Sequence, residues 1–197
     1  MRKEDYILQP ERFISLLYKL EAWRKERHID GKDQITSLYA NLLEEQAELE
    51  RALLANDQEG VIDAYCDMVV FLLNAYDIND WFSSQATLDR TIRLAHLPIK
   101  TSVLNNIRWS INKEVRLICV EQVKNINKEV YHFVAFIFQV LYMYGYDPIS
   151  CMEEVIKHIS SRKGSWDESI KKFVKDTSEE AKSQWYEADF EKCKIKS

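Results

Sequence analysis

The chain contains few of the residues that break helices. Its 197 residues include only four glycines and three prolines, while 46% of the residues are apolar and 30% are charged. Most tight turns need glycine or proline, so this scarcity argues against a fold of many short strands and favours long helices. A chain of this length can also bury a substantial core as one domain. We therefore expect an all-α fold without a second, unrelated domain.

Other absences narrow the class of protein. The first residues carry charges but no apolar run like that of a signal peptide, and the longest apolar stretch, 133–144, is interrupted by Gln139. A net charge of −5 argues against a surface that coats nucleic acid, although a few local bases can still hold a small anion. We expect a cytoplasmic protein with no membrane or nucleic-acid partner. No CxxC spacing occurs, which favours reduced thiols; the cysteines are Cys66, Cys119, Cys151 and Cys193.

Helical periodicity organises the chain into six long segments. Asp33 and Asp147 are the expected N-caps of the second and sixth segments, and Pro148 suits the first position of the sixth. Residues 1–164 are expected to form one domain, and the charged residues 165–197 to form an arm on its surface with a short helix near 178–193. The expected helices span residues 10–28, 33–56, 59–76, 102–122, 127–144 and 148–163, with a short one at 87–95.

The segment 102–145 has a helix pattern similar to that of 34–76, which suggests a degenerate internal repeat. A shift of 66 residues pairs Glu48 with Glu114, but the same shift places Phe133 opposite Asp67. The second copy therefore lacks the full acidic set of the first. If the repeat is real, one half carries chemistry and the other supplies packing; whether it is real stays open.

Acidic residues gather on the second and third expected helices. Residues three or four apart share a helix face, so Glu45 lies beside Glu48, and Asp63 lies beside Asp67. The short turn between the two helices makes them antiparallel neighbours, which brings the four carboxylates together. Glu44 lies about 100° away around its helix.

Convergent carboxylates need a positive partner, because two charges about 4 Å apart repel by about 4 kcal/mol at an effective dielectric constant of 20. Arg51 is the only basic residue between Lys32 and Arg90. An all-oxygen site selects a hard cation, Mg²⁺ or Mn²⁺. The first acidic group alone is most simply a solvated helix face. However, Asp67 precedes a wholly apolar run, and a buried acid without a basic partner favours metal binding or catalysis.

The two acidic groups read Glu44-Glu45-Gln46-Ala47-Glu48 and Asp63-Ala64-Tyr65-Cys66-Asp67. This pattern resembles the all-α nucleoside triphosphate pyrophosphohydrolases, the superfamily of MazG, the dimeric dUTPases and phosphoribosyl-ATP pyrophosphohydrolase. The segments WRKERHI and GYDPISCMEEVIKHISSRKG extend the likeness to residues 13–78 and 145–164. One departure is clear: the family's second motif is ExxD, and the residue three before Asp67 is Ala64. Asp63 would have to substitute from one residue earlier.

The resemblance implies a catalytic domain in residues 1–164 that hydrolyses a (deoxy)nucleoside triphosphate to the monophosphate and pyrophosphate. It implies that Glu45, Glu48, Asp63 and Asp67 hold Mg²⁺, with Mn²⁺ as a substitute, and that Glu44 orients or deprotonates the attacking water. It also implies a homodimer. The dimeric-dUTPase-like layout favours a pyrimidine deoxynucleotide, dUTP or dCTP.

Five further residues are candidates for substrate binding, each with a structural alternative. Arg162 and Lys163 suit the phosphates, although basic residues favour helix C-termini in any case. The amide of Asn74 lies on the face of Asp67 and can read a pyrimidine edge, unless it makes a structural hydrogen bond. Asn41 and Trp23 are candidates for the base, and Trp23 equally suits the core. Lys172 and Lys175 of the arm are further candidates for the phosphates.

Two other classes compete with hydrolysis. A helical protein that binds nucleotides or a partner without catalysis would keep the same fold. A di-iron bundle needs two ExxH motifs, and only Glu129–His132 has that form. No histidine spacing matches a metal site, so all four histidines are read as structural.

Overall fold

The computed structural model describes residues 10–75, 107–119, 126–169 and 172–195. Within these ranges the chain is mostly helical, with one two-stranded antiparallel hairpin. The expected helix at 87–95 lies outside the described residues. The elements are α1 (Pro10–Glu26), α2 (Gly31–Ala55), α3 (Gln58–Ala75), α7 (Ile107–Cys119), α8 (Ile126–Met143), α9 (Pro148–Ser161), β1 (Gly164–Asp167), β2 (Lys172–Lys175), α10 (Glu179–Lys182) and the 3-10 helix η2 (Phe190–Cys193).

The six long helices predicted from periodicity are present in the described ranges. The all-α prediction is wrong in the arm, where β1 and β2 pair with Gly164 opposite Lys175 and Asp167 opposite Lys172. In place of the short helix predicted near 178–193, this stretch holds the four-residue α10 and the short η2, with irregular chain between them. The described part of the arm is therefore less helical than predicted.

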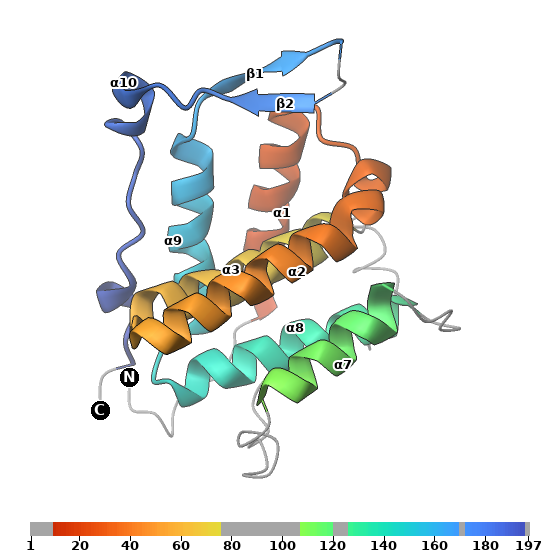
Figure 1. The fold of residues 1–197 in the computed structure, drawn as a ribbon, viewed down its shortest axis with the longest axis vertical. Coiled ribbons are helices and arrows are strands. Elements are labelled where there is room, and N and C mark those ends of the chain that lie inside the picture. The colour runs from red at the N-terminus through yellow and green to blue at the C-terminus, as the bar shows by residue number, and fades with distance from the viewer. Residues whose placement is uncertain (1–9, 76–106, 120–125, 170–171, 196–197) are drawn as a thin grey trace.

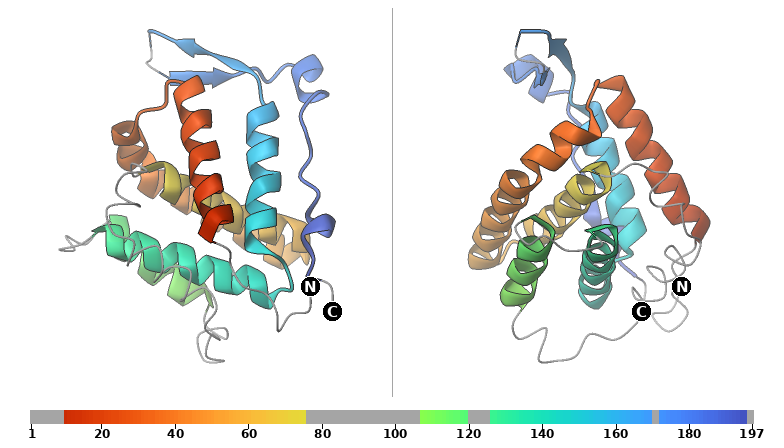
Figure 2. Two further views of the ribbon diagram at one scale, coloured as in Figure 1. Left: turned by 180° about the vertical axis from the view of Figure 1, so that it is seen from behind. Right: turned by 90° about the vertical axis from the view of Figure 1, so that its right-hand side faces the viewer.

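The helices pack as two antiparallel pairs with a further layer across them. Figure 1 shows α2 and α3 side by side above the pair α7 and α8, with α1 and α9 behind the upper pair. Helix α7 contacts α2, and α8 contacts α3. Figure 2 shows from the side that α1 and α9 flank α3 on the face away from α2. A duplicated helix pair would give this layout, and the internal repeat stays a prediction.

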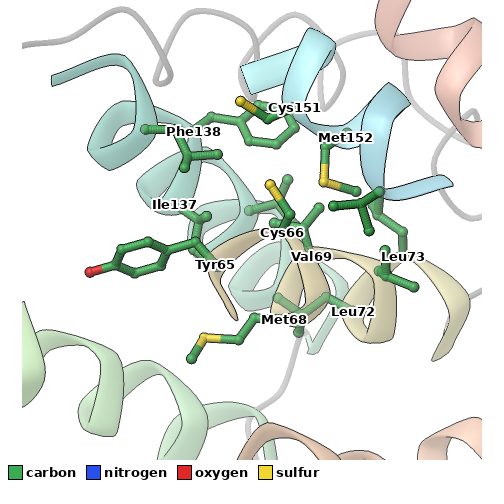
Figure 3. Close-up of a cluster of buried hydrophobic side chains, with 14 of the residues drawn as sticks. Tyr65, Cys66, Met68, Val69, Leu72, Leu73, Ile137, Phe138, Cys151 and Met152 are labelled. Carbon is green, nitrogen blue, oxygen red and sulfur yellow. The ribbon is translucent and has the colours of Figure 1, made fainter. Parts of the chain in front are cut away.

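Helix α3 is the centre of the core, as its apolar sequence predicts. Nearly every residue from Val61 to Ala75 is buried, and Asp63, Asp67 and Phe71 are the partly buried exceptions. Figure 3 shows the side chains of α3 packed against α8 and α9. Burial of each large apolar side chain contributes about 1.5–3 kcal/mol, which fixes the position of α3 between its neighbours. The labelled residues in contact there include Cys66, Val69, Leu72, Ile137, Phe138, Cys151 and Met152.

Side-chain caps set the ends of the helices. The N-cap of α2 is Asp30, which accepts the backbone N–H of Lys32 at 2.8 Å, so the prediction of Asp33 is wrong by one turn. Asn56 ends α2 in the left-handed conformation at φ 54°, and the carboxylate of Asp57 accepts the N–H of Gly60 at 3.0 Å. Asp147 caps α9 as predicted. The tight turn between α2 and α3 follows from these local bonds.

Two arginines at the end of α1 hold the C-terminal ends of other helices. Arg24 donates to the carbonyl of Asn74 at 2.8 Å, at the end of α3. Arg27 donates to the carbonyls of Ser160 and Arg162 at 3.2 and 3.3 Å, at the end of α9. Unpaired carbonyls and the negative end of the helix dipole favour a cation there. The end of α1 therefore fixes α3 and α9 relative to each other.

The last part of the arm runs along α9. The buried carboxylate of Glu154 accepts the hydroxyl of Tyr186 and, at 3.2 Å, the N–H of Asp189. Farther on, the N–H of Asp147 donates to the carbonyl of Cys193 at 2.8 Å. These bonds attach the arm to the middle and to the start of α9. None of the described helices combines the length and the apolarity that crossing a membrane requires.

Candidate functional site

The pairing of α2 with α3 brings the predicted acids into one electrostatic group. Burial raises the pKa of Glu45 to about 8, and the negative charges of Asp67, Glu48, Asp63 and Glu44 add to this effect in that order. Burial, followed by the charge of Asp63, raises the pKa of Asp67 to about 7. Burial is also the main cause that raises the pKa of Asp63. The carboxyl groups of two helices thus act on one another inside the protein.

Glu45 is the most enclosed of these acids. Its side chain is 7% exposed, and its Oε2 atom has no hydrogen-bond partner among the described residues. A buried polar atom without a partner costs about 1–3 kcal/mol, and more when the group is charged. The site therefore carries an unsatisfied oxygen that a cation or a proton would stabilise.

The other two glutamates of α2 are more accessible. Glu44 is exposed, and the side chain of Glu48 is 51% exposed and lies 3.6 Å from Arg51. Glu48 also borders an open cavity of about 330 Å³ at the turn between α2 and α3. The acidic group is therefore enclosed on the side of Glu45 and open on the side of Glu48. The cavity is lined by Glu48, Arg51, Ala52, Ala55, Asp57, Gly60 and Asp63.

Basic residues that are distant in the sequence act electrostatically on these acids. The charge of Arg162 lowers the pKa of both Asp63 and Asp67, against the larger effect of burial. The charge of Lys175 on β2 acts on Asp67 in the same direction. No signal near the acids pointed to these residues, because the sequence around α2 and α3 is nearly free of bases. Helix-end composition suggested Arg162, and the arm's charge suggested Lys175.

His158 has a defined role beside Arg162. An Nη2 hydrogen of Arg162 points to Nε2 of His158, and Nδ1 of His158 lies against the carbonyl of Tyr186. His158 therefore links Arg162 to the arm, and its charge, ahead of that of Arg162, lowers the pKa of Asp63.

As the side chains stand, no three His, Cys, Asp or Glu residues in the described ranges form a ready metal site. The donors of the acidic group are nevertheless all oxygen, and one buried oxygen of Glu45 lacks a partner. This chemistry suits Mg²⁺, which proteins hold through one or two carboxylates together with waters and substrate phosphates rather than in a complete cage. Glu45, Glu48, Asp63 and Asp67 are the residues that fit such an ion.

The remaining predicted substrate residues do not join the acidic group. Asn74 is 1% exposed at the opposite end of α3 from Asp63, and its Oδ1 atom has no partner in the described part of the chain. Asn41 donates to Ser37 on its own helix at 3.3 Å. Trp23 donates to the carbonyl of Ile159 at 3.4 Å and packs against Arg27. Lys163 is exposed and donates to Gln184 at 3.2 Å.

Comparisons of the chain with protein-family models, with curated proteins and with solved structures find no match. The likeness of the acidic motifs to a known superfamily stays a resemblance.

Proposed function

We propose that this protein is a Mg²⁺-dependent nucleoside triphosphate pyrophosphohydrolase with a MazG-like helical bundle. It would convert a (deoxy)nucleoside triphosphate and water to the monophosphate and pyrophosphate. The observation that supports this most strongly is the meeting of the buried Glu45 with the partly buried Asp63 and Asp67 on two paired helices, where burial raises the pKa of each carboxyl group. The same residues form the motifs that resemble the superfamily.

The carboxylates have distinct roles in this proposal. Glu45, Glu48, Asp63 and Asp67 hold Mg²⁺, which when bound neutralises phosphate charge and lowers the pKa of a coordinated water. Because its pKa is raised to about 8, Glu45 holds a proton at neutral pH and releases it when the ion binds. Glu44 is exposed on the next face of α2, where it can orient or deprotonate a water.

The substrate's phosphates need protein cations in addition to the metal, and Arg162 is the residue of the predicted set whose charge reaches Asp63 and Asp67. An arginine fork matches two phosphate oxygens at once. The preference for dUTP or dCTP and the homodimer rest on the resemblance alone. The burial of Asn74 gives no support to its role in reading the base.

A pyrophosphate-release assay with a panel of nucleoside triphosphates and Mg²⁺ tests the proposal. We expect turnover by the wild type and a loss of about 100-fold or more in Glu45→Gln and Asp67→Asn, because metal-assisted charge stabilisation is worth several kcal/mol. Asp33→Asn, an exposed acid on the same helix, should retain wild-type activity.

Two outcomes would contradict hydrolysis. Folded Glu45→Gln and Asp67→Asn proteins that turn over substrate like the wild type would remove the acids from the mechanism. Nucleotides that stabilise the wild type without any turnover would instead indicate a non-catalytic binding protein. Circular dichroism of each variant shows whether it is folded.

A further inference from the structure

The hairpin of β1 and β2 is fastened above the end of α1. The guanidinium of Arg27, 4% exposed, lies between two aromatic rings, with Trp23 of α1 at 5.0 Å and Phe173 of β2 at 5.3 Å. The ring of His28 lies 5.8 Å from that of Trp166 on β1. A guanidinium that is shielded from water stacks favourably on aromatic faces. The hairpin is thus held in one place relative to the helices.

The register of the hairpin directs Lys175 toward the bundle. Lys175 lies opposite Gly164, two residues beyond Arg162, and the N–H of Asp176 donates to the carbonyl of Lys163 at 2.9 Å. Alternate residues of a strand share a face, so Lys175 lies on the same face as Phe173, which packs on Arg27. Val174 lies on the opposite face and is 44% exposed. The ammonium of Lys175 is accordingly on the hairpin face that turns toward the helices, and its charge lowers the pKa of Asp67.

The following part of the arm holds Arg162. Its guanidinium lies 5.4 Å from the ring of Trp185 and contacts the ring of His158. The neighbouring Tyr186 is fixed by its N–H to Ser161 at 2.8 Å and by its hydroxyl to Glu154. The Nε atom of Arg162 is buried and has no hydrogen-bond partner within the described residues. An oriented guanidinium thus keeps one donor unused beside the acidic group.

Two cations of the arm side and the carboxylates of α3 therefore act on each other across the site. A metal-bound polyphosphate has the matching charges, because its metal faces carboxylates while its free oxygens face cations. We infer that the C-terminal hairpin is a wall of the substrate site, in which Lys175 binds the phosphate chain and Trp185 positions Arg162 to do the same. This inference rests on the proposed function and assigns the polyphosphate part of the substrate to Arg162, Lys175 and Trp185.

Binding of inorganic tripolyphosphate with Mg²⁺, measured by calorimetry, tests the inference without any turnover. We expect Lys175→Gln to bind about tenfold more weakly than the wild type, since a charge-assisted contact is lost. Lys192→Gln makes the same change on a lysine paired with Asp189 and should bind normally. Trp185→Leu should weaken binding to a similar degree, and Trp185→Phe should restore it because a ring again lies under Arg162.

The outcomes separate this inference from the proposed function. If the wild type releases pyrophosphate but Lys175→Gln binds tripolyphosphate as tightly as Lys192→Gln, the hairpin has no such role and hydrolysis stands. If tripolyphosphate binding depends on Lys175 while no nucleotide is hydrolysed, the hairpin has its role and hydrolysis fails. A wild type that does not bind tripolyphosphate overturns the inference. Lys175 is exposed, so its variant keeps the fold even if Trp185→Leu does not.

Discussion

At the scale of single residues, the buried carboxyl group of Glu45 makes the stability of the metal-free protein depend on pH. Its pKa in the folded protein is raised from 4.5 to about 8. Between these values the folded protein keeps a proton that the unfolded chain has released, so the free energy of unfolding falls as pH rises. Each unit of difference corresponds to about 1.4 kcal/mol. Below pH 4.5 both states are protonated and the destabilisation disappears.

Glu45→Gln should therefore stabilise the metal-free protein at alkaline pH. The amide keeps the shape of the side chain and removes the charge, so at pH 8.5 in EDTA we expect a melting temperature higher by at least roughly 2–4 °C, the equivalent of about 1 kcal/mol in a chain of this size. At pH 5 the difference from the wild type should nearly vanish. Glu180→Gln, an exposed control, should show no such trend. A variant that melts below the wild type at pH 8.5 would contradict the electrostatic description of the site.

At the scale of secondary-structure elements, the end of α1 joins parts of the molecule that are distant in sequence. Arg27 satisfies two carbonyls at the end of α9 and supports β2 through the ring of Phe173. A lysine in its place would keep the charge but would lose the planar guanidinium, which can donate to the two carbonyls and stack on the ring at the same time.

Arg27→Met should lower the free energy of unfolding by about 2–4 kcal/mol, because it removes the hydrogen bonds to two carbonyls at the end of α9 and the aromatic stacking of a buried guanidinium. Arg27→Lys should recover less than half of that loss. Urea denaturation of both variants gives the values, and Lys25→Met, on the exposed side of the same helix, is the control. Equal stability of all three proteins would show that the hairpin is not fastened by this residue.

Local sequence patterns predicted the helices but not the contacts between distant elements. Periodic apolar residues identified α3, and the Asp147-Pro148 pair identified the start of α9, because each signal lies within one or two turns. The hairpin escaped prediction because its strands have four residues each and are positioned by Arg27, far away in the chain. The acids were found from their spacing on one face. Arg162 and Lys175 were predicted only as phosphate-binding candidates, from the composition of a helix end and of the arm, because electrostatic pairing of Asp67 with Lys175 follows from folding and leaves no local pattern.

At the scale of the whole molecule, three buried cysteines lie where the arm packs against the core. The thiol of Cys151 on α9 hydrogen-bonds with Cys66 of α3 and with Cys193 of η2. The hydrogen bond between Cys193 and Cys151 raises the pKa of Cys193, and burial adds to this effect. The thiol of Cys193 is therefore unreactive while the arm is docked. Figure 3 shows Cys66 and Cys151 within the apolar contact between α3 and α9.

Alkylation of Cys193 should therefore report the opening of the arm. Glu154→Ala removes the acceptor of Tyr186 and Asp189, so we expect Cys193 to react faster by on the order of tenfold, with Cys66 unchanged. Mass spectrometry of the folded protein after a timed reaction with iodoacetamide measures both. Glu153→Gln changes a partly buried acid of α9 that pairs with Lys19 and Arg12 of α1 rather than with the arm, and is the matched control. Simultaneous acceleration at Cys66 would mean that the core opens with the arm.

The order of the site's parts along the chain has a consequence for synthesis. The carboxylates of α2 and α3 leave the ribosome before α9 and the hairpin are made, so the nascent helix pair carries its repelling charges without Arg162, Lys175 or the ring of Trp185. Because domains are translated from the N-terminus, these carboxylates stay hydrated until the later helices cover them, and their repulsion grows only as packing buries them. A newly made chain gains its cationic wall only when its final residues dock.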